Sequence, residues 1–148
     1  MLSIDANILL HAFNQDSPRH PVAFRWLTSI QSREDVAISE FVLAEFYVLL
    51  RNPAVLDQPL SSSAAVEVIR VYRCHPRWRL IGFASESRAL HDRLWVRAGG
   101  TDFAFRRLFD VRTALSMLVQ GVTELATANV AEFADLGFAR VWNPLEAG

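Results

Sequence analysis

The first ten residues, MLSIDANILL (residues 1–10), decide the fold class of this chain. The apolar segment Leu2–Ile4 predicts a short buried strand, and the carboxylate of Asp5 follows it directly. Residues 6–15 then predict a helix. An apolar strand followed at once by a helix is the first unit of an alternating α/β pattern.

The rest of the chain repeats this alternation. Further strands are predicted at residues 36–38, 78–83, 122–127 and 138–142. Further helices are predicted at residues 21–29, 40–50, 61–73, 86–97, 111–120 and 130–134. Ser39 is a good N-cap for the helix at 40–50. Gly121 is a good C-terminal cap for the helix at 111–120. We therefore predict a single domain over residues 1–148, an α/β sandwich with a mainly parallel central sheet.

The composition excludes several classes of protein. The chain has 148 residues, of which 51% are hydrophobic and 21% charged, enough apolar material for one buried core. Cys74 is the only cysteine, which excludes a disulfide framework and a thiolate metal site within one chain. No apolar run reaches the roughly 20 residues of a membrane span. The first residues carry no basic flank, so we expect no signal peptide and a cytoplasmic location.

The charge is unevenly distributed although the net charge is −1. Ten arginines lie between Arg70 and Arg112, and the chain has no lysine. A basic middle segment is compatible with a polyanionic partner such as RNA. A solvated helical surface explains the same feature and is the simpler interpretation.

Polar side chains gather where predicted strands end. In open parallel sheets, sites form in the crevice beyond the carboxyl ends of the strands. The candidates are Asp5, Asn7, Ser39, Thr127 and Asn129, with Asp110 at the start of a predicted helix and Glu45 two turns into another. Asp5 and Asp110 could instead act only as helix caps. Glu45 lies among apolar neighbours in a helix with no obvious exposed face, and burial of a lone carboxylate costs several kcal/mol, as an order of magnitude.

Three carboxylates brought together repel one another, and their pKa values rise unless a cation holds them ionised. Mg²⁺ suits this set of ligands, because it binds one or two protein carboxylates and retains several waters. Such a site can hydrolyse phosphodiester bonds by polarising the phosphoryl oxygen and activating a water.

Four segments in this order resemble the PIN-domain family and its VapC toxins. They are Leu2–Leu10 with Asp5 and Asn7, Ser39–Glu45, Phe109–Leu115 running through Gly121-Val122, and a tail from Ala126 to Leu145. The resemblance covers nearly the whole chain. It implies a PIN-like three-layer sandwich and Mg²⁺- or Mn²⁺-dependent cleavage of RNA. It also implies homodimerisation and inhibition by a cognate antitoxin.

The resemblance also assigns roles to individual residues. Asp5 and Asp110 would be the principal metal ligands, and Glu45 would complete the acidic cluster directly or through a water. Asn7, Ser39 and Thr127 would orient ligands or water. Many relatives carry a fourth acid where this chain has Asn129, so the number of metal ions stays open. Asp102 could replace that acid, although its Gly-rich loop favours ordinary solvent exposure.

The residue types of the chain disfavour several other classes of protein. Haloacid-dehalogenase-like phosphatases, receiver domains and P-loop nucleotidases use a lysine, which this chain lacks. Cysteine catalysis is disfavoured because Cys74 and His75 are adjacent. Trp78 and Trp95 could stack on RNA bases, but core packing is the simpler expectation for both. The remaining alternative is a catalytically silent PIN-like module that binds RNA or protein.

Overall fold

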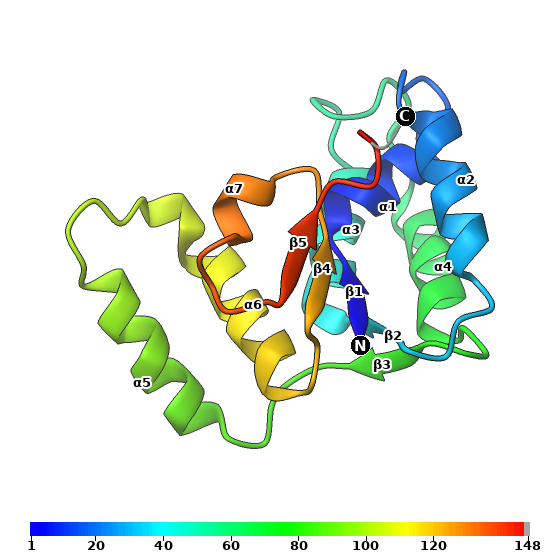
Figure 1. The fold of residues 1–148 in the computed structure, drawn as a ribbon. Helices are drawn as coiled ribbons and strands as arrows, with labels where there is room; N and C mark the ends of the chain where they lie inside the picture. Colours follow the sequence, from blue (N-terminus) through cyan, green and yellow to red (C-terminus); the bar gives the residue numbers. More distant parts are fainter. Residues whose placement is uncertain (147–148) are drawn as a thin grey trace.

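A five-stranded sheet forms the centre of the molecule, and the computed structural model describes residues 1–146 (Figure 1). The strands are β1 (Leu2–Ile4), β2 (Val36–Ser39), β3 (Arg79–Ile81), β4 (Glu124–Ala126) and β5 (Arg140–Trp142). They lie in the order β3-β2-β1-β4-β5, and every neighbouring pair is parallel. The predicted α/β class with a mainly parallel sheet is confirmed.

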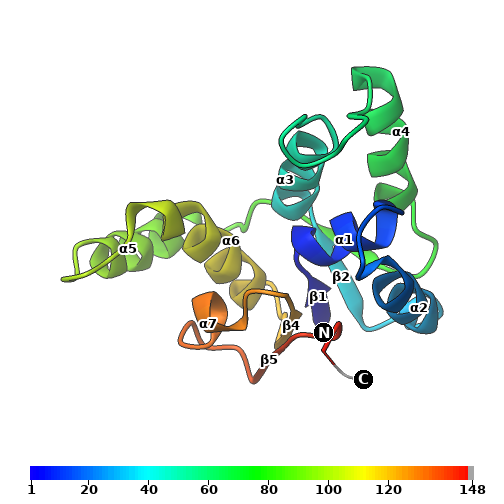
Figure 2. The same cartoon turned by 90° about the horizontal axis from the view of Figure 1, so that it is seen from above.

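Helices cover both sides of this sheet. They are α1 (Ala6–Phe13), α2 (His20–Ile30), α3 (Glu40–Leu50), α4 (Ser62–Arg73), α5 (Ser87–Ala98), α6 (Leu108–Val119) and α7 (Val130–Phe133), with a 3₁₀ turn at Phe105–Arg107. Both views place α6 and α7 on one side of the sheet and α2 on the other, with α5 outside α6 (Figures 1 and 2). The predicted three-layer sandwich is confirmed.

Local sequence explains most helix boundaries. The Ser39 hydroxyl accepts a hydrogen bond from the Phe41 N–H (3.1 Å) and so begins α3. Ser61 caps α4 in the same way. Gly121 follows α6 with a φ of +93°, in the left-handed region that favours glycine.

Two expectations were wrong in detail. Helix α6 begins at Leu108 rather than at residue 111, because the 3₁₀ turn leads directly into it. Asp110 therefore lies inside the first turn of α6 and is not its N-cap. The outer strands are shorter than predicted.

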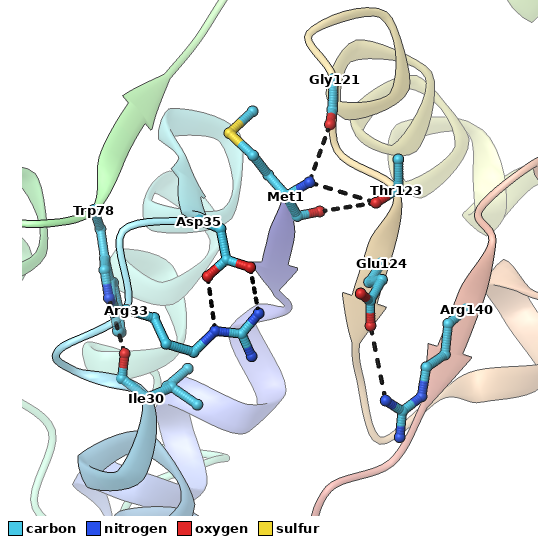
Figure 3. A network of polar contacts seen from close by, with 9 residues as sticks. All are labelled: Met1, Ile30, Arg33, Asp35, Trp78, Gly121, Thr123, Glu124 and Arg140. Atoms are coloured by element: carbon cyan, nitrogen blue, oxygen red, sulfur yellow. Dashed lines mark hydrogen bonds and ion pairs between the residues drawn. The ribbon is translucent and has the colours of Figure 1, made fainter.

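Charges at the amino ends of the strands are paired, as Figure 3 shows. Arg33 binds Asp35 through two nitrogens (2.8 and 2.6 Å), and Arg140 lies 3.8 Å from Glu124. The N-terminal amine of Met1 donates to the Gly121 carbonyl (3.3 Å). The arginines at this end of the sheet thus neutralise the acids beside them.

Of the helices in residues 1–146, none has the length and apolar character required to cross a bilayer.

Candidate active site

The site lies where the strand order changes direction. The chain adds β2 and β3 on one side of β1 and then crosses to add β4 and β5 on the other side, so the switch point lies between β1 and β4. Ligands of open parallel sheets bind in the crevice beyond the carboxyl ends at such a point. Ile4 and Ala126 are partners in the register of β1 and β4, and therefore Asp5 and Thr127 leave the sheet side by side.

Hydrogen bonds hold both oxygens of the Asp5 carboxylate. The Thr127 hydroxyl and the Asn7 side-chain amide donate to Oδ2, at 2.7 and 3.2 Å. The Ala6 N–H donates to Oδ1 at 2.7 Å, so Asp5 is also the N-cap of α1. The Asn7 carbonyl oxygen in turn accepts from the Ala128 N–H (3.1 Å). The carboxylate that caps α1 therefore also accepts a hydrogen bond from Thr127, which follows β4.

Asp110 and Glu45 lie close enough to Asp5 to perturb its electrostatics and each other's. Burial raises the pKa of Asp110 to about 6, repulsion from Asp5 and Glu132 adds to this, and Arg107 opposes it. Burial also raises the pKa of Glu45 to about 7, with repulsion from Asp5 and Asp110. Burial raises the pKa of Asp5 as well, against the hydrogen bonds it accepts. The fold thus brings the three predicted acids into one region.

The expectation that Glu45 is a buried carboxylate was wrong. Glu45 is exposed and does not belong to the buried face of α3. Its carboxyl group nonetheless loses water to the surrounding helices, which is the largest cause of its raised pKa. Apolar sequence neighbours alone did not reveal this, because Val42, Leu43 and Phe46 take the core face of the same helix.

The donor chemistry fits a hard divalent cation. Within residues 1–146, none of the three acids forms a salt bridge. The same residues contain no group of three His, Cys, Asp or Glu side chains close enough to hold an ion by themselves. Two carboxylates with the remaining positions filled by water can satisfy a hard divalent cation. A bound cation would favour the ionised carboxylates, whose pKa values are raised chiefly by burial and secondly by repulsion.

Glu132 is a residue that sequence reasoning missed. It lies in the first turn of α7 and raises the pKa of both Asp5 and Asp110 by repulsion. Its side chain is exposed and, among the described residues, has no salt bridge. In the sequence, Glu132 lies three residues after Asn129, the position at which many relatives carry a fourth acid.

The other predicted positions differ in their surroundings. Ser39 is buried and its hydroxyl serves as the cap of α3, with no hydrogen bond to the acids in residues 1–146. Asn129 is exposed and contributes a backbone N–H to the Thr127 hydroxyl (3.0 Å). Asp102 is exposed in a turn with a φ of +64°, as the Gly-rich loop predicted.

The expected nucleic-acid features are only partly present. Six of the ten arginines between Arg70 and Arg112 pair with acids, which supports the solvated-surface interpretation of that segment. Trp78 is buried and packs in the core as expected. Trp95 is 59% exposed, so the expectation of core packing was wrong for it. Cys74 is exposed.

Comparison with known proteins agrees with this architecture. The chain is 46% identical over 145 residues to Ribonuclease VapC24 of Mycobacterium tuberculosis, covering 98% of this chain and 97% of the relative. Its fold resembles VapC20 of M. tuberculosis, described as a toxin that cleaves the sarcin-ricin loop (TM-score 0.64, 18% identity, 90% and 94% of the two chains covered). It also resembles VapBC2 of Rickettsia felis bound to a promoter DNA fragment (TM-score 0.62, 17% identity, 96% and 97% covered). The family model of the PIN domain matches residues 2–139, and the chain therefore belongs to the PIN domain family.

Proposed function

We propose that this protein is a divalent-metal-dependent endoribonuclease and the toxin of a toxin–antitoxin pair. In this proposal residues 1–148 form a single PIN domain that acts in the cytoplasm. The name of the relative, Ribonuclease VapC24, and its near-complete overlap with this chain support the activity. The fold of VapC20 supports the architecture but, at 18% identity, nothing more.

One observation carries the proposal: within residues 1–146, the acids at the carboxyl ends of the strands form no salt bridge. At the amino ends, Asp35 and Glu124 each pair with an arginine. At the carboxyl ends, Asp5, Glu45 and Asp110 repel one another, and the pKa values of all three are raised. Such repulsion lowers stability unless a ligand compensates for it, and raised pKa values in a crevice indicate a functional site.

Asp5 and Asp110 are the side chains that would hold Mg²⁺ or Mn²⁺, with Glu45 reaching it through water. When bound, the ion polarises the phosphoryl oxygen and makes the attacking water more acidic. Thr127 and Asn7 keep the Asp5 carboxylate in one orientation through their hydrogen bonds. We assign to Glu45 the exchange of a proton with the attacking water, since its carboxyl group lies near those of Asp5 and Asp110.

RNA, a cognate antitoxin and a second copy of the chain are the partners in this proposal. The VapBC2 assembly supports a protein partner for toxins of this fold. The alternative is a catalytically silent PIN-like module, and it rested on the neutral Asn129 at a position where many relatives carry an acid. Glu132 weakens that alternative, because it supplies a carboxylate beside Asp5 and Asp110.

The experiment compares wild type with Asp110→Asn, both expressed without an antitoxin. Growth arrest and RNA fragments from the wild type alone are expected. A purified-protein assay with Mg²⁺, Mn²⁺ or EDTA then tests metal dependence, and Asp102→Asn serves as a matched control because Asp102 is an exposed carboxylate outside the cluster. Equal toxicity of wild type and Asp110→Asn would contradict the proposal, as would undiminished cleavage in EDTA.

A further inference from the structure

An exposed group of aromatic rings surrounds one arginine beside the acids. We call Phe41, Phe83, Phe109 and Arg112 the aromatic–arginine cluster. The guanidinium carbon of Arg112 lies 5.7 Å from the ring centre of Phe41 and 5.2 Å from that of Phe109. Phe83 meets Phe41 edge to face, with ring centres 5.0 Å apart. These distances are typical of cation–π and aromatic pairs.

The two outer rings of the cluster are open to solvent although their backbone is fixed. Phe83 is 87% exposed and Phe109 is 64% exposed. The carbonyl of Gly82, directly before Phe83, accepts hydrogen bonds from Gln120 Nε2 (2.8 Å) and Ser116 Oγ (3.1 Å) of α6. Large apolar side chains are usually buried, so the exposure of these two rings needs an explanation. Exposed rings on a fixed backbone can stack on a ligand without rearrangement.

Arg112 has no anionic partner within the described residues. Eight salt bridges are found there, and none includes Arg112. Its Nε is buried without a hydrogen-bond partner in the same residues. Arg107, and not Arg112, is the cation that lowers the pKa of Asp110. The charge of Arg112 is therefore free to bind a phosphate while its planar face contacts the rings.

The cluster adjoins the acids along two helices. Phe41 and Glu45 lie four residues apart on α3, which puts them on one face of the helix. Phe109 precedes Asp110 in α6, where consecutive side chains point about 100° apart, so the link between the cluster and the acids rests on Phe41 and Glu45. A strand of RNA whose phosphate lies at the acids would thus carry its neighbouring nucleotide onto the cluster.

We propose that Phe83, Phe109 and Arg112 bind one unpaired nucleotide of the RNA substrate next to the scissile phosphate. The base stacks on the phenylalanine rings and the flanking phosphate pairs with Arg112. This proposal rests on the proposed ribonuclease function and adds a nucleotide-binding subsite beside the acids. Stacking on open rings reads no base edges, so the subsite favours unpaired nucleotides over any one sequence.

A small cavity beside the cluster indicates that a base would stack on the exposed rings and would not be buried within the protein. It is lined in part by Phe41, Phe83 and Arg112, and its volume is about 40 Å³. That volume accommodates water molecules and not a nucleobase. The base is therefore held on the exposed ring faces, where contacts are sequence-tolerant.

The test uses Phe83→Ala, Phe109→Ala and Arg112→Gln, with Phe24→Ala as control because Phe24 is a similarly exposed phenylalanine (58%) on α2. Cleavage of a single-stranded RNA 12-mer is followed with Mg²⁺, and binding of the same labelled RNA is measured in EDTA. Each phenylalanine variant is expected to raise KM and Kd about tenfold with little change in kcat. Arg112→Gln is expected to reduce the slope of log Kd against log salt by about one.

An abasic nucleotide in the RNA separates stacking from a general loss of contact. Removing the base next to the cleaved bond should weaken binding to wild type and not to the Phe83→Ala, Phe109→Ala double variant. If all variants keep the KM and Kd of wild type while RNA is cleaved, the subsite is wrong and the nuclease proposal stands. If Asp5→Asn cleaves as wild type does, the nuclease proposal fails, whereas binding in EDTA still decides whether the cluster holds RNA.

Discussion

Replacing Asp110 with asparagine should stabilise the metal-free protein, which is an unusual result for a residue of an active site. The pKa of Asp110 is raised from 3.8 to about 6, chiefly by burial and secondly by repulsion from Asp5 and Glu132. Ionisation of this carboxyl is therefore costlier in the folded state than in the unfolded state. Asparagine keeps the size and the polarity of the side chain and removes the charge.

The sign of the pH dependence follows from the two pKa values. Well below pH 3.8 the carboxyl of Asp110 is protonated in both states, and wild type and Asp110→Asn should differ little. As pH rises through about 6, the folded wild type loses its proton and the stabilisation that the raised pKa represents. The asparagine variant does not titrate at this position, so its advantage should grow between pH 4 and pH 7 and then level off.

The shift from 3.8 to about 6 corresponds to a ceiling of about 3 kcal/mol. Solvent reaches part of the side chain, and we expect about 1 to 2 kcal/mol after that screening. For a chain of this size, thermal melting in EDTA at pH 8 should then show an increase of about 3 to 6 °C for Asp110→Asn. Mg²⁺ should reverse the order, because an ion at about 100 times its Kd adds about 2.7 kcal/mol to the protein that binds it.

Asp102→Asn is the matched control, since Asp102 is exposed in a turn and asparagine tolerates its left-handed backbone. It should melt with wild type under every condition. A metal-free Asp110→Asn protein that is less stable than wild type by the same amount at pH 4 and pH 8 would refute the reasoning. So would an equal Mg²⁺ response of the two proteins.

Three further changes test other parts of the structure. Thr127→Val removes the 2.7 Å hydrogen bond to Asp5, so cleavage should fall about 10- to 100-fold and the acid limb of the pH–rate profile should move to higher pH; an unmoved profile would contradict the orienting role. Gly121→Ala puts a side chain on a φ of +93° and should cost about 1 to 2 kcal/mol in urea denaturation, whereas no loss would mean that the turn relaxes. Phe46→Ala empties a fully buried position and should cost about 3 to 5 kcal/mol by the same measurement, and a loss below about 1 kcal/mol would contradict the packing described.

The sequence was most informative where local rules and tertiary structure agree. The strand at Leu2–Ile4 and the helix at Glu40–Leu50 occur as predicted, because an apolar run and a serine cap specify them locally. The first turn of α6 was missed. A 3₁₀ turn at Phe105–Arg107 leads into that helix, and no capping residue marks the transition.

The site was only partly predictable for a different reason. Asp5 and Thr127 could be placed together, since adjacent parallel strands end at the same edge of the sheet. The position of Glu132 near Asp5 and Asp110 depends on how α7 packs after β4. A single exposed glutamate in a short helix does not predict that packing. The exposure of Glu45 likewise depends on which face of α3 meets the core.

The arrangement of Arg107 explains how the acids stay available for a cation. A guanidinium inserted among Asp5, Glu45 and Asp110 would neutralise them and occupy the place of a metal. Arg107 is instead bound to α7 and the segment after it: its Nη2 donates to the Glu132 carbonyl (2.8 Å) and to Asp135 (3.3 Å). From there it lowers the pKa of Asp110 without a salt bridge to it. The attraction of Arg107 partly offsets the repulsion among the acids, which limits the loss of stability in the metal-free protein. Because Arg107 does not contact the carboxylates, their oxygens stay open to a divalent ion.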